Sequence, residues 1–109
     1  MEVELDKGLI VLVTIPEKKA KSFSRKLLGK KLCACVNLIR GLESFFWWEG
    51  KISTAKEALL VIKTKGSNFL KLEKFIKSIH PYTVPEIIAC KIDRINKAYL
   101  SWLIKESSD

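Results

Sequence analysis

The segment Lys51–Thr64 constrains the fold more than any other part of the chain, because it predicts an unusually long β-strand with two apolar faces. Side chains alternate between the faces of a strand, so Leu59 and Val61 point away from Leu60 and Ile62. The strand would span roughly 45 Å at about 3.3 Å per residue, whereas mean strands have about 5–6 residues. The two main helices of a small domain can cover only one face of its sheet, so the second face must meet the last helix, another subunit, or both.

A β-hairpin is predicted at the start of this strand. Leu42–Trp48 reads as its other arm, and Glu49-Gly50 supplies the turn. We interpret the hairpin as an arm that extends into a neighbouring subunit, anchored by aromatic side chains near its tip. These anchors are Phe45, Phe46, Trp47 and Trp48. The alternative is that they belong to the core of the same chain, because aromatic residues supply cores as readily as interfaces.

The remaining periodicity predicts further strands and helices around this hairpin. The strands are Leu9–Ile15, Cys33–Ile39 with a bulge or kink at Arg40-Gly41, and Glu86–Asp93. The helices are Glu17–Lys31, Gly66 to about Ile79, and a short last helix capped by Asn96. The order β-α-β-β-α-β plus a terminal helix predicts an α+β, ferredoxin-like split βαβ fold, with both main helices on one face of an antiparallel sheet.

Length and composition indicate one domain over residues 1–109. No apolar run approaches the roughly 18 residues needed to cross a bilayer, and the first residues lack the build of a signal peptide. We therefore expect a cytoplasmic protein that does not enter a membrane. Cys33, Cys35 and Cys90 form an odd set, which favours reduced thiols over a disulfide framework.

The formal net charge of +8 points to an anionic partner in general terms, and seven basic residues fall within residues 18–31. The alternative is an ordinary solvated helix face. RNA-recognition domains share the ferredoxin-like plan, but they place stacking aromatic side chains on the third strand. Because Lys51–Thr64 holds no aromatic residue, we do not expect the protein to bind nucleic acid.

The cysteines are candidate metal ligands. Cys33 and Cys35 are two apart on a predicted strand, where two thiolates could hold a soft ion such as Cu(I). The alternative is that both are small buried hydrophobes. Cys90 lies on the opposite edge of the predicted sheet, roughly 14 Å away at about 4.8 Å per strand spacing, against a thiolate–metal bond of about 2.3 Å. A site that joins all three could form only between subunits.

The junction His80–Ile87 contains the only histidine of the chain, between a helix and a strand. Its imidazole is suited to Cu(II) or another borderline metal, with Glu86 as a second ligand. The alternative is that His80 faces the last carbonyl groups of the preceding helix.

A second candidate site is a ligand cleft. Glu57 and Lys63 share a face of the third strand, and with Tyr82, Glu86 and Trp48 they form the predicted cleft. The alternative for Glu57 and Lys63 is a structural ion pair. Because there is one histidine and no Gly-rich phosphate loop, we expect no enzymatic activity and no required cofactor.

Five blocks of the sequence, in order and spacing, resemble the CutA family. They are LCACVN at 32–37, WWEGK at 47–51, KT at 63–64, HPY at 80–82 with PE at 85–86, and YLSWL at 99–103. The resemblance covers essentially the whole chain. It implies a homotrimer in which the long hairpin strands pair across subunits, and a role in divalent-cation tolerance with copper binding.

Other points of the resemblance leave the ligand open. Some family members carry a cysteine at the place of Val13 and a second histidine at the place of Ile79, so the fullest version of the metal site is absent. The family also resembles PII signalling proteins in architecture, which implies a small anionic ligand at subunit clefts as an alternative. We predict a trimeric cytoplasmic protein that responds to metal ions and binds copper or another divalent cation.

Overall fold

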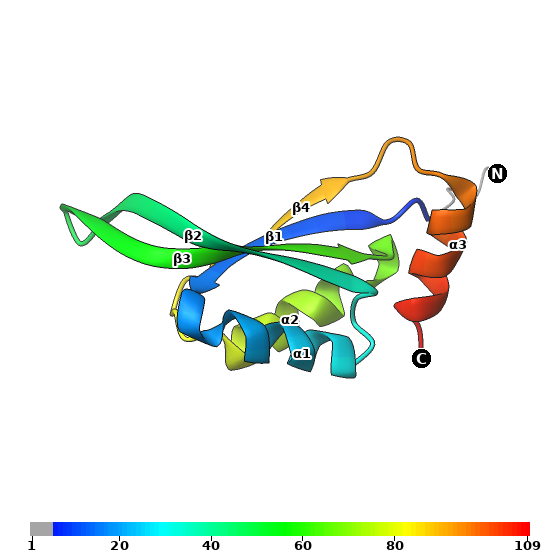
Figure 1. Cartoon of the computed structure of the whole chain (residues 1–109), viewed down its shortest axis with the longest axis horizontal. Helices are drawn as coiled ribbons and strands as arrows, with labels where there is room; N and C mark the ends of the chain where they lie inside the picture. Colours follow the sequence, from blue (N-terminus) through cyan, green and yellow to red (C-terminus); the bar gives the residue numbers. More distant parts are fainter. Residues whose placement is uncertain (1–5) are drawn as a thin grey trace.

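The long hairpin dominates the computed structural model, which describes residues 6–109 (Figure 1). Strands β2 (Cys35–Trp48) and β3 (Lys51–Thr64) pair along their whole length, and their outer halves extend beyond the helices. We call this outer part, residues 42–56, the arm. It makes the molecule elongated, with extents of 50, 29 and 24 Å.

The sheet has the order β2-β3-β1-β4, and every neighbouring pair is antiparallel. The central strand β1 (Leu9–Pro16) pairs with β3 and with the short edge strand β4 (Ile88–Lys91). The register of β2 shifts between Ile39 and Leu42, which confirms the predicted bulge. Gly41 has φ +78° there, a conformation that glycine adopts without steric cost.

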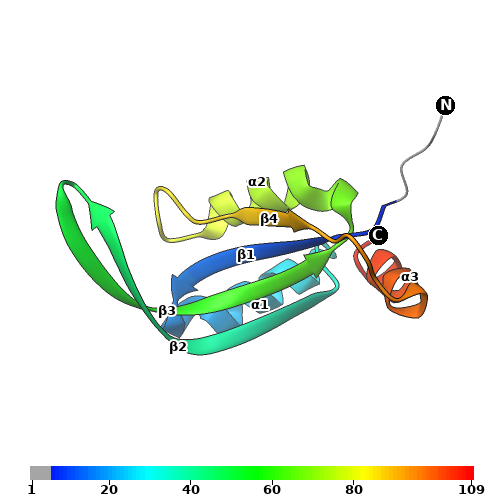
Figure 2. The same ribbon diagram turned by 90° about the horizontal axis from the view of Figure 1, so that it is seen from above.

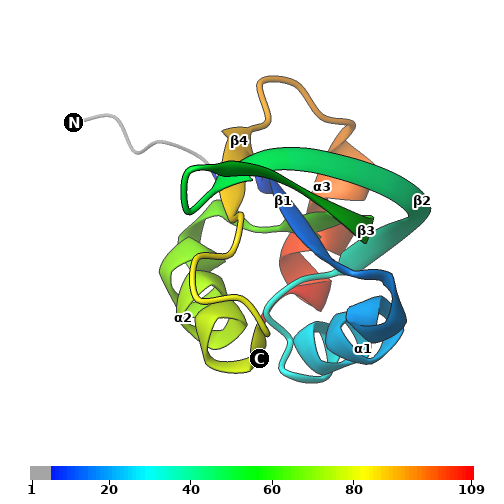
Figure 3. The same ribbon diagram turned by 90° about the vertical axis from the view of Figure 1, so that its left-hand side faces the viewer.

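The helices cover one face of the sheet, as predicted (Figure 3). Helix α1 (Ala20–Gly29) and helix α2 (Phe69–Ile79) each follow a single 3₁₀ turn, and α3 (Lys97–Glu106) lies across one end of the sheet. Asn96 caps α3 by accepting a hydrogen bond from the Tyr99 amide at 3.1 Å. No helix within residues 6–109 is long and apolar enough to cross a membrane.

The core fills the space between the sheet and α1 and α2. Its buried members come from alternate positions of β1 and β3, from the inner stripes of the helices and, for Cys33, from the segment between α1 and β2: Val11, Val13, Ile15, Ala20, Phe23, Leu27, Cys33, Ala58, Leu60, Ile62, Leu72 and Ile76. On the other face of β3, Leu59 and Val61 are only half-buried. The view from above shows this face without a helix across it (Figure 2).

The predicted boundaries of three elements were wrong. The second strand begins at Cys35 rather than Cys33. The first helix ends at Gly29 rather than Lys31, because Lys31 takes a left-handed conformation with φ 59°. The fourth strand is Ile88–Lys91 rather than Glu86–Asp93. Pro85 has no N–H group to donate to a ladder, and the chain joins the sheet only after it.

Asp6 ties the start of the chain to the turn before α2. Its carboxylate accepts hydrogen bonds from the amides of Gly66 at 2.7 Å, Gly8 at 2.9 Å and Ser67 at 3.3 Å. Burial raises the pKa of Asp6, but these hydrogen bonds outweigh it and leave the pKa below its ordinary value.

We expect Asp6→Ala to lower the free energy of unfolding by about 1–2 kcal/mol at neutral pH, because three amides lose their acceptor. Asp6→Asn keeps one side-chain oxygen and should lose less. Urea unfolding followed by circular dichroism measures both. The contribution of Asp6 should be complete above about pH 4 and lost as the pH falls through its lowered pKa. Equal stability of wild type and Asp6→Ala at pH 7 would contradict this role.

Candidate functional site

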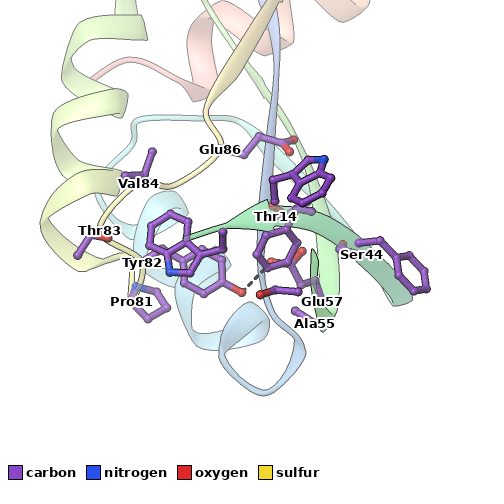
Figure 4. A pocket seen from close by; sticks show the side chains of 14 residues that line it. Thr14, Ser44, Ala55, Glu57, Pro81, Tyr82, Thr83, Val84 and Glu86 are labelled. Atoms are coloured by element: carbon purple, nitrogen blue, oxygen red, sulfur yellow. Dashed lines mark hydrogen bonds between the residues drawn. The ribbon is translucent and has the colours of Figure 1, made fainter. Parts of the chain in front are cut away.

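A hollow of about 910 Å³ lies between the arm and the loop that follows α2 (Figure 4). The arm contributes residues 44–48, 53 and 55, β1 contributes Thr14, and the loop contributes residues 81–84 and 86. Glu57 lies at the point where β3 enters the body of the sheet, and its carboxylate faces the hollow. The site therefore forms where the three-stranded part of the sheet meets the two-stranded arm.

Two carboxylates supply the charge of this hollow. Glu57 is only 4% exposed, and it accepts a hydrogen bond from the Tyr82 hydroxyl at 2.7 Å. Burial and this hydrogen bond raise the pKa of Tyr82 to about 12, so the hydroxyl stays protonated and donates. Burial, followed by the charge of Glu57, raises the pKa of Glu86. None of the described residues that line the hollow is basic.

His80 stands behind the hollow with both ring nitrogens engaged. It is 8% exposed, and its ring lies edge-on to Phe23 with centroids 5.6 Å apart. The Tyr82 amide donates to Nδ1 at 3.1 Å, so Nε2 carries the proton and donates to the Thr14 carbonyl at 2.9 Å. The imidazole therefore faces β1, not the last carbonyls of α2, and a metal ion could reach a ring nitrogen only by displacing one of these hydrogen bonds.

The five predicted metal ligands do not lie together at one site in the structure. Strand β2 begins at Cys35, so Cys33 lies outside the strand, and the period of two does not relate their thiols. Cys33 packs into the core, where burial and then the neighbouring Cys35 raise the pKa of its thiol to about 12. Cys90 is exposed on β4, at the opposite edge. No cluster of three or more His, Cys, Asp or Glu residues suited to a metal ion occurs between residues 6 and 109.

The predicted cleft is assembled in part. Trp48, Glu57, Tyr82 and Glu86 all line the hollow, but Lys63 does not. Lys63 donates to the Asn37 side chain, and it lies six residues along β3 from Glu57, about 20 Å at about 3.3 Å per residue. The ion pair considered for Glu57 and Lys63 is absent from the described residues, since Glu57 bonds to Tyr82 instead.

Thr14 is a residue of the hollow that the sequence did not lead us to predict. Its side chain lines the hollow, and its backbone carbonyl accepts the hydrogen bond from His80, which lies 66 residues further along the chain. The signal was present, because Thr14 is the one polar residue in the otherwise apolar run at 9–15. A polar side chain in a buried strand is best explained when it faces a site.

Comparisons with known proteins cover nearly the whole described chain. The family model for CutA1 divalent ion tolerance protein matches residues 9–106. A chloroplastic CutA 1 protein of Oryza sativa is 46% identical over 97 residues, which are 88% of this chain and 55% of that protein. The chain thus spans about half the length of the rice relative. A divalent-cation tolerance protein CutA of Thermus thermophilus is 43% identical over 95 residues, 86% of this chain and 92% of that one.

Solved structures have the same fold as this chain. The divalent cation tolerance protein of Thermus thermophilus superposes with a TM-score of 0.88 at 40% identity, over 93% of this chain and 99% of that chain. CutA1 from Oryza sativa superposes with a TM-score of 0.87 at 42% identity, over 95% and 96% of the two chains.

We expect the imidazole of His80 to titrate below 6.5 and to be the Nε2–H tautomer, because burial lowers its pKa while the Thr14 carbonyl and the Glu57 charge oppose this only in part. NMR of the ring nitrogens reads this directly, since the chain has one histidine. Stability should be complete above about pH 6.5 and decrease as the pH falls toward the lowered pKa. A midpoint at or above 6.5, or an Nδ1–H tautomer, would contradict the hydrogen bonding described above.

Proposed function

Because this chain belongs to the CutA1 divalent ion tolerance protein family, we propose that it is a homotrimer that binds Cu(II) or another divalent cation at the carboxylates of the hollow. The observation that carries the proposal is the pair Glu57 and Glu86 facing a cavity with no basic side chain among its described lining residues. Burial, and then the charge of Glu57, raises the pKa of Glu86. Carboxylate oxygens bind divalent cations, and a bound cation would offset the repulsion between the two carboxylates.

The charge of the hollow favours a cation over a small anion as its ligand. A PII-like anionic ligand would need basic groups at the cleft, and Lys63, the basic residue predicted there, bonds to Asn37 instead. An anion in the hollow would meet Glu57 and Glu86 without compensation. The cation is therefore the candidate that the described residues support.

The arm supports assembly into an oligomer. Trp47, Phe45 and Ile52 are 72%, 66% and 65% exposed in the single chain, and each would gain about 1.5–3 kcal/mol if fully buried. The hollow is also far larger than the roughly 30 Å³ that one water occupies, so it has room for side chains of a neighbour. The subunit number of three follows from the family resemblance. A partner's arm could add ligands that one chain lacks.

We propose a binding role rather than a catalytic one. His80, the natural acid–base candidate, has both ring nitrogens occupied by backbone groups. Tyr82 has its pKa raised to about 12, which suits a hydrogen-bond donor and not a base near neutral pH. A cytoplasmic location remains a prediction.

We expect Glu57→Gln and Glu86→Gln each to weaken Cu(II) binding at least tenfold, because each removes a charge but keeps a side-chain oxygen. Isothermal titration calorimetry at pH 7 measures this, with Glu73→Gln as the control at a carboxylate outside the hollow. Affinity should fall as the pH is lowered, since protonation of Glu86 competes with the cation. Unchanged heats in both hollow variants would remove the proposed site, and a loss confined to His80→Ala would move it to the imidazole.

We expect the native protein to have a mass of about 37 kDa in size-exclusion chromatography with light scattering, three times the 12.4 kDa chain. The variant Phe45→Ser/Trp47→Ser should shift toward the monomer, because it removes two exposed apolar anchors of the arm. Trp102→Ser is the control, since Trp102 is partly exposed on α3, away from the arm. A monomer at micromolar concentration would refute the assembly.

A further inference from the structure

The net charge of the chain is concentrated in its helix layer. Residues 17–31 and 66–80, which include α1 and α2, hold 10 of the 20 basic residues but only Glu17 and Glu73 among the 12 acidic ones. These segments therefore have a net charge of +8, equal to that of the whole chain, and the remaining residues balance to zero. All ten basic side chains are exposed.

Several of these basic residues share one face of α1 and of the turn that precedes it. The stripe on this face consists of residues at helical spacing i, i+3, i+4, i+7 and i+8. They are Lys18, Lys21, Ser22, Arg25 and Lys26, and together they line a shallow depression. We call this set the basic stripe. The opposite stripe of α1 is buried in the core.

The basic stripe has no acidic partner among residues 6–109. The ion pairs of the helix layer are Lys31–Glu106 at 3.3 Å and Lys77–Glu73 at 3.7 Å, and neither involves the stripe. Like charges three and four residues apart on a helix repel each other. An anion that bridged several of them would relieve this repulsion, so the stripe is suited to a ligand with repeated negative charge.

We propose that the basic stripe is a docking surface for the phosphate backbone of double-stranded nucleic acid, bound without base recognition. From Lys18 to Lys26 the stripe is about 12 Å long at 1.5 Å per residue. A nucleic-acid strand presents one phosphate per about 3.4 Å of helix axis, so the stripe faces three or four phosphates. The sequence pI of about 9.5 matches the charge of such domains.

An anionic membrane fits these observations less well. A membrane-surface helix inserts an apolar face, but Ala20, Phe23 and Leu27 of α1 are buried in the core. The exposed large apolar side chains of the two helices are single leucines, Leu28 and Leu70. The expectation against nucleic acid concerned stacking aromatics on the sheet, whereas this surface lies on the helices and needs none.

Assembly through the arm would leave this surface free. The arm extends past the ends of α1 and α2, and the hollow lies beside the arm (Figure 1, Figure 4). The two surfaces use different residues, so the docking proposal does not depend on cation binding.

The test is fluorescence anisotropy of a mixed-sequence 20-base-pair DNA duplex, titrated with protein at several salt concentrations. We expect binding whose log affinity falls with log salt at a slope of about −3 per stripe, since about 3.5 phosphates are neutralised. The variant Lys21→Glu/Arg25→Glu/Lys26→Glu should weaken binding at least about tenfold at 50 mM salt and flatten the slope. The same positions changed to Gln should give a smaller loss, and circular dichroism verifies that each variant folds.

The matched control is Lys91→Glu/Arg94→Glu/Lys97→Glu. It makes the same charge change on exposed residues from the end of β4 to the start of α3, a segment that lies across the sheet from α1 (Figure 1). It should retain affinity within about threefold. Equal losses in both triple variants would show that net charge alone drives binding and would overturn the proposal. So would an absence of binding at low salt, or binding to phosphatidylserine vesicles with none to the duplex.

Discussion

The pairing of β3 is the constraint on which the rest of the structure depends. Its inner half, residues 57–64, has β1 on one side and β2 on the other, whereas its outer half pairs with β2 alone. The change occurs where Pro16 ends β1 opposite Glu57, and the register shift of β2 lies beside the same residue. Losing a strand at this point opens space beside Glu57, and the loop after α2 reaches the same space with Tyr82. The site is thus a consequence of unequal strand lengths.

The predictable part of the fold consists of features with a local sequence signal. The order of elements, the bulge at Arg40-Gly41, the turn at Glu49-Gly50 and the Asn96 cap all follow from periodicity and from residues with strong backbone preferences. The boundaries of the first helix and the last strand do not follow from the local sequence, because they depend on backbone conformation and on pairing partners. The start of β2 also depends on pairing, and this is why Cys33 lies outside it.

The candidate site was predicted less completely. The sequence shows which residues share a face of a strand, but it does not show how far apart they lie on that face. Alternation along a strand put Glu57 and Lys63 on one face, but it gave no reason for them to meet, and they lie about 20 Å apart. His80 was recognised as important for its chemistry, yet its partners are two backbone groups, the Thr14 carbonyl and the Tyr82 amide. Backbone partners carry no side-chain signature, so only the fold reveals that the ring is already satisfied.

Net charge alone would have assigned the wrong ligand to the hollow. A chain of +8 suggests an anionic partner, but the hollow carries two carboxylates and no basic side chain among its described lining residues. The excess positive charge lies on the helix layer, whereas the arm is the part of the sheet that extends past the ends of α1 and α2 (Figure 1). The charge of the ligand that a site binds therefore has to be inferred from the residues that line that site. The net charge of the chain is evidence only about the surface on which the excess charge lies.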